Sequence, residues 1–128
     1  MKLVAEISAG ELIDKITILR IKLDHIDDPA KRANIRREYD SLTQTLDSAI
    51  APDDEIARLF GELEAVNREL WRIEDEIRDK ERMCDFGGEF IALARAVYKT
   101  NDLRAELKRR INFVTGSKII EEKSYASY

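Results

Sequence analysis

Residues 56–77 read IARLFGELEAVNRELWRIEDEI, the clearest periodic pattern in the chain. Apolar residues recur there at alternating steps of three and four, as in a coiled-coil seam: Ile56, Leu59, Leu63, Val66, Leu70, Ile73 and Ile77. We expect one helix from this stretch to about Met83, and a helix of about 30 residues is roughly 45 Å long. A compact chain of this length is only about 30–35 Å across, so shorter helices cannot cover the whole seam.

A second long helix is expected to fold back along the first. Residues 84–88, Cys-Asp-Phe-Gly-Gly, form a turn, and an apolar stripe follows at helical spacing: Phe90, Leu93, Val97, Leu107, Ile111 and Val114. Residues 100–102, Thr-Asn-Asp, weaken this helix in its middle, because Asn and Asp side chains compete for backbone hydrogen bonds. Gly116 is a natural residue to end it. The two long helices therefore form an antiparallel hairpin.

Two shorter helices are expected before the hairpin. Ser8 caps the first, with Glu11 reaching back to it in a capping box. Asp28 and Pro29 separate the two helices, since Pro is favoured in the first turn of a helix. The apolar stripes are Leu12, Ile16, Leu19, Leu23 and Ile26 in the first and Ile35, Tyr39, Leu42, Leu46 and Ala49 in the second.

The sequence thus predicts a mainly α helical bundle, built on the long hairpin, as a single domain over residues 1–128. The end segments, Lys2–Ile7 and Lys118–Tyr125, are compatible with β structure. A short pairing of these N- and C-terminal segments is left open.

Composition excludes several classes of protein. Charged residues make up 38% and hydrophobic ones 44% of the chain, which is too apolar for disorder. No apolar run reaches the roughly 18 residues of a membrane span, and Glu6 comes too early for a secretory signal. The net charge of −4 argues against nucleic-acid binding. A single cysteine, Cys84, allows no internal disulfide, so we expect a cytoplasmic protein.

Four segments carry a recognisable pattern: GELIDKITIL at 10–19, ELWRIED at 69–75, NDLRA at 101–105 and EEKSY at 121–125. In these segments the chain resembles a family of small bacterial proteins that has no assigned function. The resemblance covers both ends and the centre of the chain and leaves out residues 28–54 and the Cys84 turn. It implies a bacterial, intracellular, mainly helical protein and assigns no catalytic residues.

The middle of the hairpin offers a candidate ligand or partner surface. Pairing around the turn near Phe86 sets Trp71 level with Asn101. The surface comprises Trp71, Glu74 and Arg78 from the first long helix and Tyr98, Asn101, Asp102, Arg104 and Lys108 from the second. Aromatic, amide and charged groups together are typical of binding sites. The alternative is that the aromatics pack against the shorter helices and the charges form ordinary ion pairs.

Carboxylates three residues apart suggest a metal-dependent nucleotide pyrophosphohydrolase as an alternative function. The pairs Glu11/Asp14 and Glu76/Asp79 fit one of the two carboxylate pairs by which such helical enzymes hold Mg²⁺. The second pair, Glu-x-x-Glu, is absent from the sequence. One cysteine and one histidine cannot form a zinc site within one chain, so we expect no metal and no cofactor.

We expect a homo-oligomer, because uncovered heptads would expose Leu and Ile side chains to water. The preferred function is a non-enzymatic, oligomerising interaction or scaffold module. Such a module could also bind another protein. We expect it to bind neither nucleic acid nor membrane. A small-ligand-binding protein or an enzyme that uses the mid-hairpin surface is the alternative.

Overall fold

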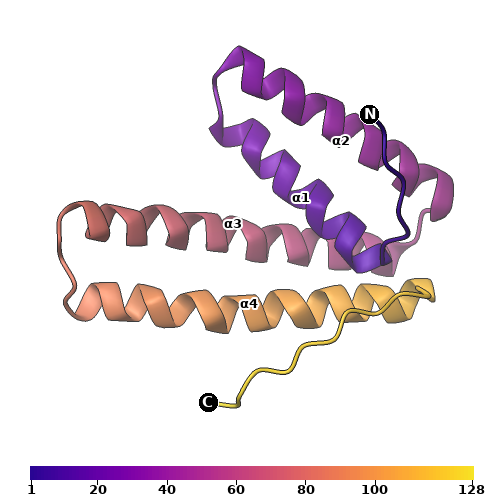
Figure 1. Ribbon diagram of the computed structural model, residues 1–128. Helices are drawn as coiled ribbons and strands as arrows, with labels where there is room; N and C mark the ends of the chain where they lie inside the picture. The colour runs from indigo at the N-terminus through magenta and orange to yellow at the C-terminus, as the bar shows by residue number, and fades with distance from the viewer.

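The computed structural model describes residues 1–128 and contains four helices: α1 (Ala9–His25), α2 (Pro29–Ala49), α3 (Asp54–Arg82) and α4 (Gly88–Thr115). Figure 1 shows the antiparallel α3–α4 hairpin, with α1 lying across one half of it and α2 beyond α1. α1 packs against the other three helices, whereas α2 packs against α1 alone. The predicted helical bundle on a long hairpin is confirmed.

The starts and ends of the helices follow from local chemistry. Ser8, Asp28 and Asp53 each accept a hydrogen bond from a backbone N–H in the first turn of the helix they precede. Gly116 ends α4 with φ of 65°, the left-handed region that favours glycine. The predicted reach of Glu11 back to Ser8 is wrong, because the Glu11 carboxylate pairs with Lys108.

The core lies where α1 crosses the hairpin. Ile13, Leu59, Leu63 and Ile111 form one cluster in which no side chain is more than 1% exposed. Eight of the 17 residues of α1 are buried, against one of the 21 in α2. Since α1 is covered on several sides, a polar residue in its middle must find its partners inside the protein.

The outer part of the hairpin projects beyond α1 (Figure 1). His25, the last residue of α1, stacks on Trp71 with ring centroids 5.0 Å apart. We define Arg72–Ala96 as the free hairpin end. No seam residue of α3 is exposed, because α4 runs beside α3 along its length. The exposed large apolar side chains of the free hairpin end lie on the turn and α4 instead: Met83, Phe86 and Ile91.

Neither end of the chain forms a strand, so the strand pairing that the sequence left open is wrong. The two end segments begin side by side, where the Ala9 N–H donates to Ser117 Oγ at 3.3 Å. From there they diverge: residues 1–7 extend away into solvent, and residues 118–128, which we define as the tail, run back along α4 (Figure 1). Segments that separate in this way cannot share a hydrogen-bonded ladder.

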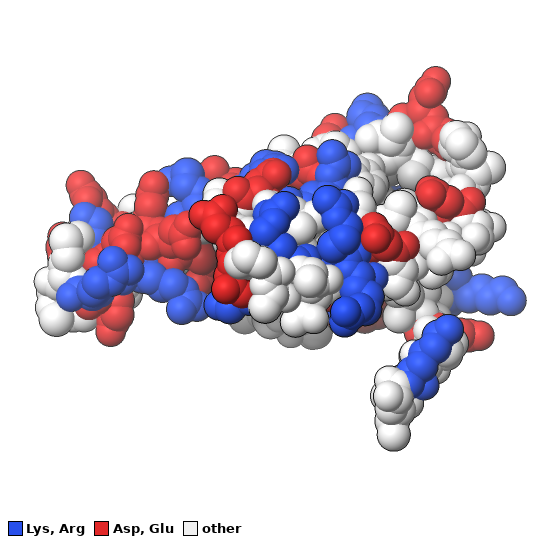
Figure 2. All heavy atoms as spheres, turned by 90° about the horizontal axis from the view of Figure 1, so that it is seen from above, with Lys and Arg blue, Asp and Glu red and all other residues white.

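Acidic and basic side chains are intermixed along the free hairpin end (Figure 2). Ion pairs one helical turn apart account for part of this pattern, including Arg72 with Glu76 and Arg82 with Asp79. Such exposed pairs contribute little to stability. None of the four helices combines the length and the apolar character that crossing a membrane requires.

Candidate functional site

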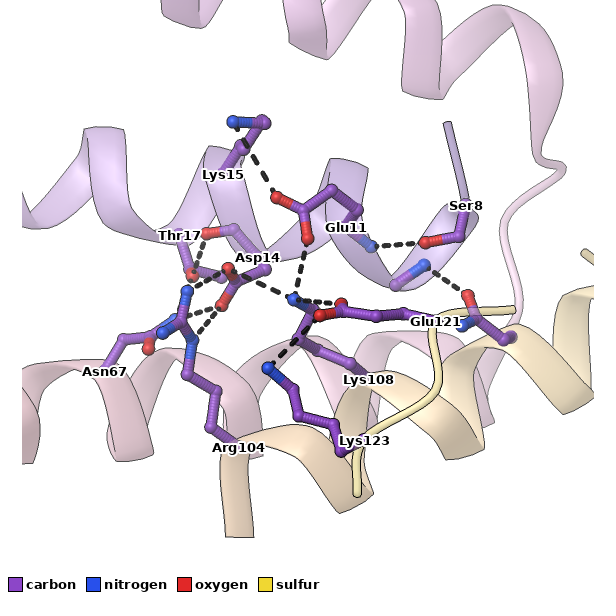
Figure 3. A network of polar contacts seen from close by, with 12 residues as sticks. Ser8, Glu11, Asp14, Lys15, Thr17, Asn67, Arg104, Lys108, Glu121 and Lys123 are labelled. Carbon is purple, nitrogen blue, oxygen red and sulfur yellow. Dashed lines mark hydrogen bonds and ion pairs between the residues drawn. The ribbon is translucent and has the colours of Figure 1, made fainter. Parts of the chain in front are cut away.

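Asp14 is the one charged residue among the buried side chains, at 1% exposed. Arg104 of α4 donates two hydrogen bonds to its carboxylate, from Nε to Oδ1 at 2.9 Å and from Nη2 to Oδ2 at 2.5 Å (Figure 3). Two parallel charge-assisted bonds form the strongest arrangement for this kind of pair. The geometry fixes both the distance and the rotation between α1 and α4.

Asn67 adds α3 to the same point. Its Nδ2 donates to Asp14 Oδ1 at 2.9 Å and to Thr17 Oγ1 at 2.8 Å, while the Thr17 hydroxyl donates to the Asp14 carbonyl at 2.7 Å. Asn67 itself is 5% exposed. Three helices therefore meet around one buried carboxylate, both oxygens of which accept hydrogen bonds.

Lys108 links this cluster to the tail. Its Nζ lies 2.7 Å from Glu11 Oε2, 3.9 Å from Asp14 Oδ2 and 3.2 Å from Glu121 Oε2 (Figure 3). We define the Asp14 network as Glu11, Asp14, Asn67, Arg104, Lys108 and Glu121. Lys123 joins its edge through Glu121 at 3.1 Å. With Lys123 included, the positive and negative charges balance.

The pKa shifts show that the central groups of the Asp14 network stay charged. Burial alone would raise the pKa of Asp14, but hydrogen bonds from Arg104 and Asn67 outweigh it and hold the pKa below its ordinary value. Burial would lower the pKa of Lys108, and its pairs with Glu11, Asp14 and Glu121 reverse this into a rise. Each of these groups therefore stabilises the charged form of its partners.

Gly10 allows α1 and α4 to approach closely beside the Asp14 network. A Cβ atom at this position would lie 2.4 Å from the Lys108 carbonyl oxygen and 2.9 Å from Asn112 Oδ1. The Gly10 N–H donates to that Oδ1 at 2.7 Å, and Asn112 is buried. No side chain fits between these two backbones.

The predicted mid-hairpin surface divides into two parts. Tyr98, Asn101, Asp102, Arg104 and Lys108 line one groove together with the tail. Trp71 faces α1 instead, stacked on His25. Glu74 and Arg78 form an exposed ion pair at 3.5 Å. The residues from α4 are therefore brought together, and those from α3 lie apart from them.

The register in which α3 and α4 pair explains why the predicted surface residues of the two helices lie apart. The predicted pairing of the two long helices is confirmed, since Asn67 and Arg104 both contact Asp14. α4 is continuous through Asn101 and Asp102, so the expected weak point does not interrupt it. Residues level with one another on the two helices still point to different sides of the hairpin.

The groove between α4 and the tail has a volume of about 860 Å³. At one end the rings of Tyr98 and Tyr128 meet edge to face, with centroids 5.1 Å apart. The Tyr128 hydroxyl donates to Asp102, and this hydrogen bond raises the pKa of Tyr128. We define this groove as the tail groove.

Sequence reasoning missed Glu11, Asp14, Asn67 and Glu121 as members of one site. A signal was present, because Asp14 and Thr17 interrupt a helix that is apolar on most sides, and Asn67 does the same on the inner face of α3. Glu11 and Asp14 pair with Lys108 and Arg104. No group of three or more His, Cys, Asp or Glu side chains is placed to hold a metal ion.

Three of the four segments that carry the family resemblance meet at this site. Residues 10–19 supply Glu11 and Asp14, residues 101–105 supply Arg104, and residues 121–125 supply Glu121. Residues 69–75 lie outside it. No curated protein and no solved structure matches the chain. A family model described as "Family of unknown function (DUF6165)" matches residues 1–128, and the chain belongs to that family.

Proposed function

We propose that this protein is a non-enzymatic interaction module of the bacterial cytoplasm that self-associates through the free hairpin end. The observation that carries the proposal is the exposure of apolar side chains there: Met83 is 64%, Phe86 52% and Ile91 56% exposed. Two helices alone have no further layer to bury these groups. A second hairpin packed against the first would form a four-helix arrangement with an enclosed core.

The solvent-accessible surface area of the chain supports the same proposal. The chain exposes 8919 Å², whereas a folded monomer of this mass exposes about 7,000 Å². The difference of about 1,900 Å² comes from the projecting hairpin and the two extended ends. A stable interface of standard size covers about 800 Å² on each partner, so the free hairpin end and its surroundings have enough surface for one.

The state of the charged groups favours binding over catalysis. The pKa of Asp14 is lowered and the pKa values of Arg104 and Lys108 are raised, all away from neutrality. In the second acidic pair considered for Mg²⁺, Glu76 pairs with Arg72 and Asp79 with Arg82. Carboxylates engaged in this way would have to give up their partners before they could bind a cation.

Light scattering on the full-length protein at micromolar concentration tests self-association. Wild type is expected to have at least twice the 14.8 kDa mass of one chain. Ile91→Asp should give the monomer with the helical content unchanged, because it sets a charge in the proposed apolar contact. Leu103→Asp is the matched control, since Leu103 is 54% exposed on α4 outside the free hairpin end.

Two results would overturn the proposal. One is a wild-type protein that scatters as a single chain. The other is dissociation by Leu103→Asp to the same degree as by Ile91→Asp, which would move the contact away from the free hairpin end.

A further inference from the structure

The tail is held against α4 by side chains alone. No hydrogen bond between backbone groups involves residues 118–128, and each of these residues is exposed. The contacts to α4 are Glu121 with Lys108 at 3.2 Å, Glu122 with Arg109 at 3.2 Å, and Tyr128 with Tyr98 and Asp102. The tail therefore forms one wall of the tail groove, as an extended segment fixed at its two ends.

These contacts are too few to hold the tail permanently. Fixing the backbone of one residue costs more free energy than an exposed ion pair returns. Eleven residues are ordered here, and Glu122 and Tyr128 are 73% and 76% exposed. The tail consequently exchanges with a detached state in which the α4 side of the groove is open.

The open groove has a definite chemistry. Detachment removes Glu121 from Lys108 and Glu122 from Arg109, which leaves two adjacent cations with fewer partners. Further along α4, Tyr98 presents an aromatic ring and Asp102 an acceptor for a hydroxyl group. A segment that matches these groups on α4 is extended and has two neighbouring carboxylates followed by a tyrosine, as the tail itself has.

We propose that the α4 side of the tail groove is a docking site for an extended acidic, tyrosine-containing segment of a partner protein, with the tail as its intramolecular competitor. A foreign segment is favoured over the tail of a second copy. The tethered tail acts at an effective concentration in the millimolar range, so an identical tail from another chain gains no advantage over it. The site lies apart from the free hairpin end and does not depend on self-association.

Fluorescence anisotropy tests the site with the full-length protein and a labelled peptide of residues 118–128, KIIEEKSYASY, as the probe. The double variant Glu122→Ala, Tyr128→Ala weakens the tethered tail without touching the helices. It should bind the probe at least ten-fold more tightly than wild type, because the competitor is removed. The charge-reversed probe KIIKKKSYASY should not bind.

Neighbouring arginines provide a matched pair for the groove itself. Arg109→Glu in the double variant should abolish probe binding, since Arg109 contacts Glu122. Arg110→Glu should leave binding unchanged, because Arg110 pairs with Glu106 at 3.0 Å and does not contact the tail. Repeating the measurement in the Ile91→Asp background separates this result from self-association.

Three outcomes would overturn the proposal. The double variant could bind the probe no better than wild type, which would mean that the tail does not compete for the groove. The two arginine variants could lose binding equally, which would reduce the interaction to general charge attraction. The double variant could also lower the mass of a wild-type oligomer, which would make the tail of a second copy the occupant.

Discussion

Gly10 and Gly61 are both helical glycines, yet alanine should act on them in opposite directions. A Cβ at Gly10 would clash with the Lys108 carbonyl oxygen at 2.4 Å, whereas a Cβ at Gly61 meets nothing within 4 Å. Gly10→Ala should lower the free energy of unfolding by about 1–3 kcal/mol through overpacking. Gly61→Ala should raise it by about 0.5–1 kcal/mol. Urea unfolding measures both, and a Gly10→Ala protein as stable as wild type would contradict the close approach of α1 and α4.

Asp14 and Asp24 of α1 each pair with an arginine from another helix, but only Asp14 is buried. Asp14→Asn should lower the free energy of unfolding by about 2–3 kcal/mol, because the partly buried Arg104 loses the carboxylate that accepts both of its hydrogen bonds. Asp24→Asn is the control. It breaks an exposed pair with Arg68 at 2.7 Å, which should cost no more than about 1 kcal/mol. Equal losses in urea unfolding would show that Asp14 is not desolvated.

The lowered pKa of Asp14 predicts a loss of stability in acid. The unfolded chain binds the proton at about pH 3.9, and the folded protein only at lower pH. The contribution of ionised Asp14 is therefore fully present above the unfolded pKa and is lost as pH falls through the folded pKa. Urea midpoints from pH 7 to pH 2 should fall less steeply below pH 4 for Asp14→Asn than for wild type, and identical slopes would contradict the prediction.

At the scale of elements, the helices were predictable because their signals are local. Ser8, Asp28 and Asp53 provide caps within one turn, and the seam of α3 repeats through three heptads. The short alternation in residues 2–7 suggested a strand wrongly, since six residues give too little pattern to separate a strand from an extended end. The sequence could not predict that Trp71 faces α1, because this orientation depends on where His25, at the end of α1, lies relative to α3.

Trp71 and Asn101 lie level on the hairpin and should respond differently to alanine. Trp71 is half-buried against His25, so Trp71→Ala should lower the free energy of unfolding by about 1–3 kcal/mol, less than a fully buried aromatic residue. Asn101→Ala should raise it by about 0.5 kcal/mol, because alanine is the better helix former. Thermal melts of the two variants measure this. A large loss for Asn101→Ala would give that side chain a structural role.

At the scale of the whole molecule, α2 should be the least stable helix. It packs against α1 alone and has one buried residue, Ile35. Local opening is easiest where few apolar contacts hold an element, so the amides of α2 should exchange with solvent faster than those of α1 and the inner half of α3. Hydrogen–deuterium exchange by mass spectrometry checks this, and equal protection of α1 and α2 would contradict it.

The Asp14 network could not be assembled from the sequence because its members are far apart along the chain. Asp14 and Arg104 are separated by 90 residues, and Asn67 and Asp14 by 53. A buried acid on α1 indicates that a cation lies nearby, but the chain has 22 lysines and arginines from which to choose. The angle at which α1 crosses the hairpin determines which of these cations pairs with Asp14, and no local sequence pattern encodes that angle.

The position of α1 at the centre of the fold has a consequence during synthesis. This helix leaves the ribosome before the other three, and Arg104 follows Asp14 by 90 residues. At about 5–20 residues per second, that interval is about 5–20 s. During it the nascent chain can pair α1 only with α2 and then α3, so the side of α1 that packs on α4 stays accessible. A chaperone at the exit site would meet α1 before the other three helices, and its release would await α4.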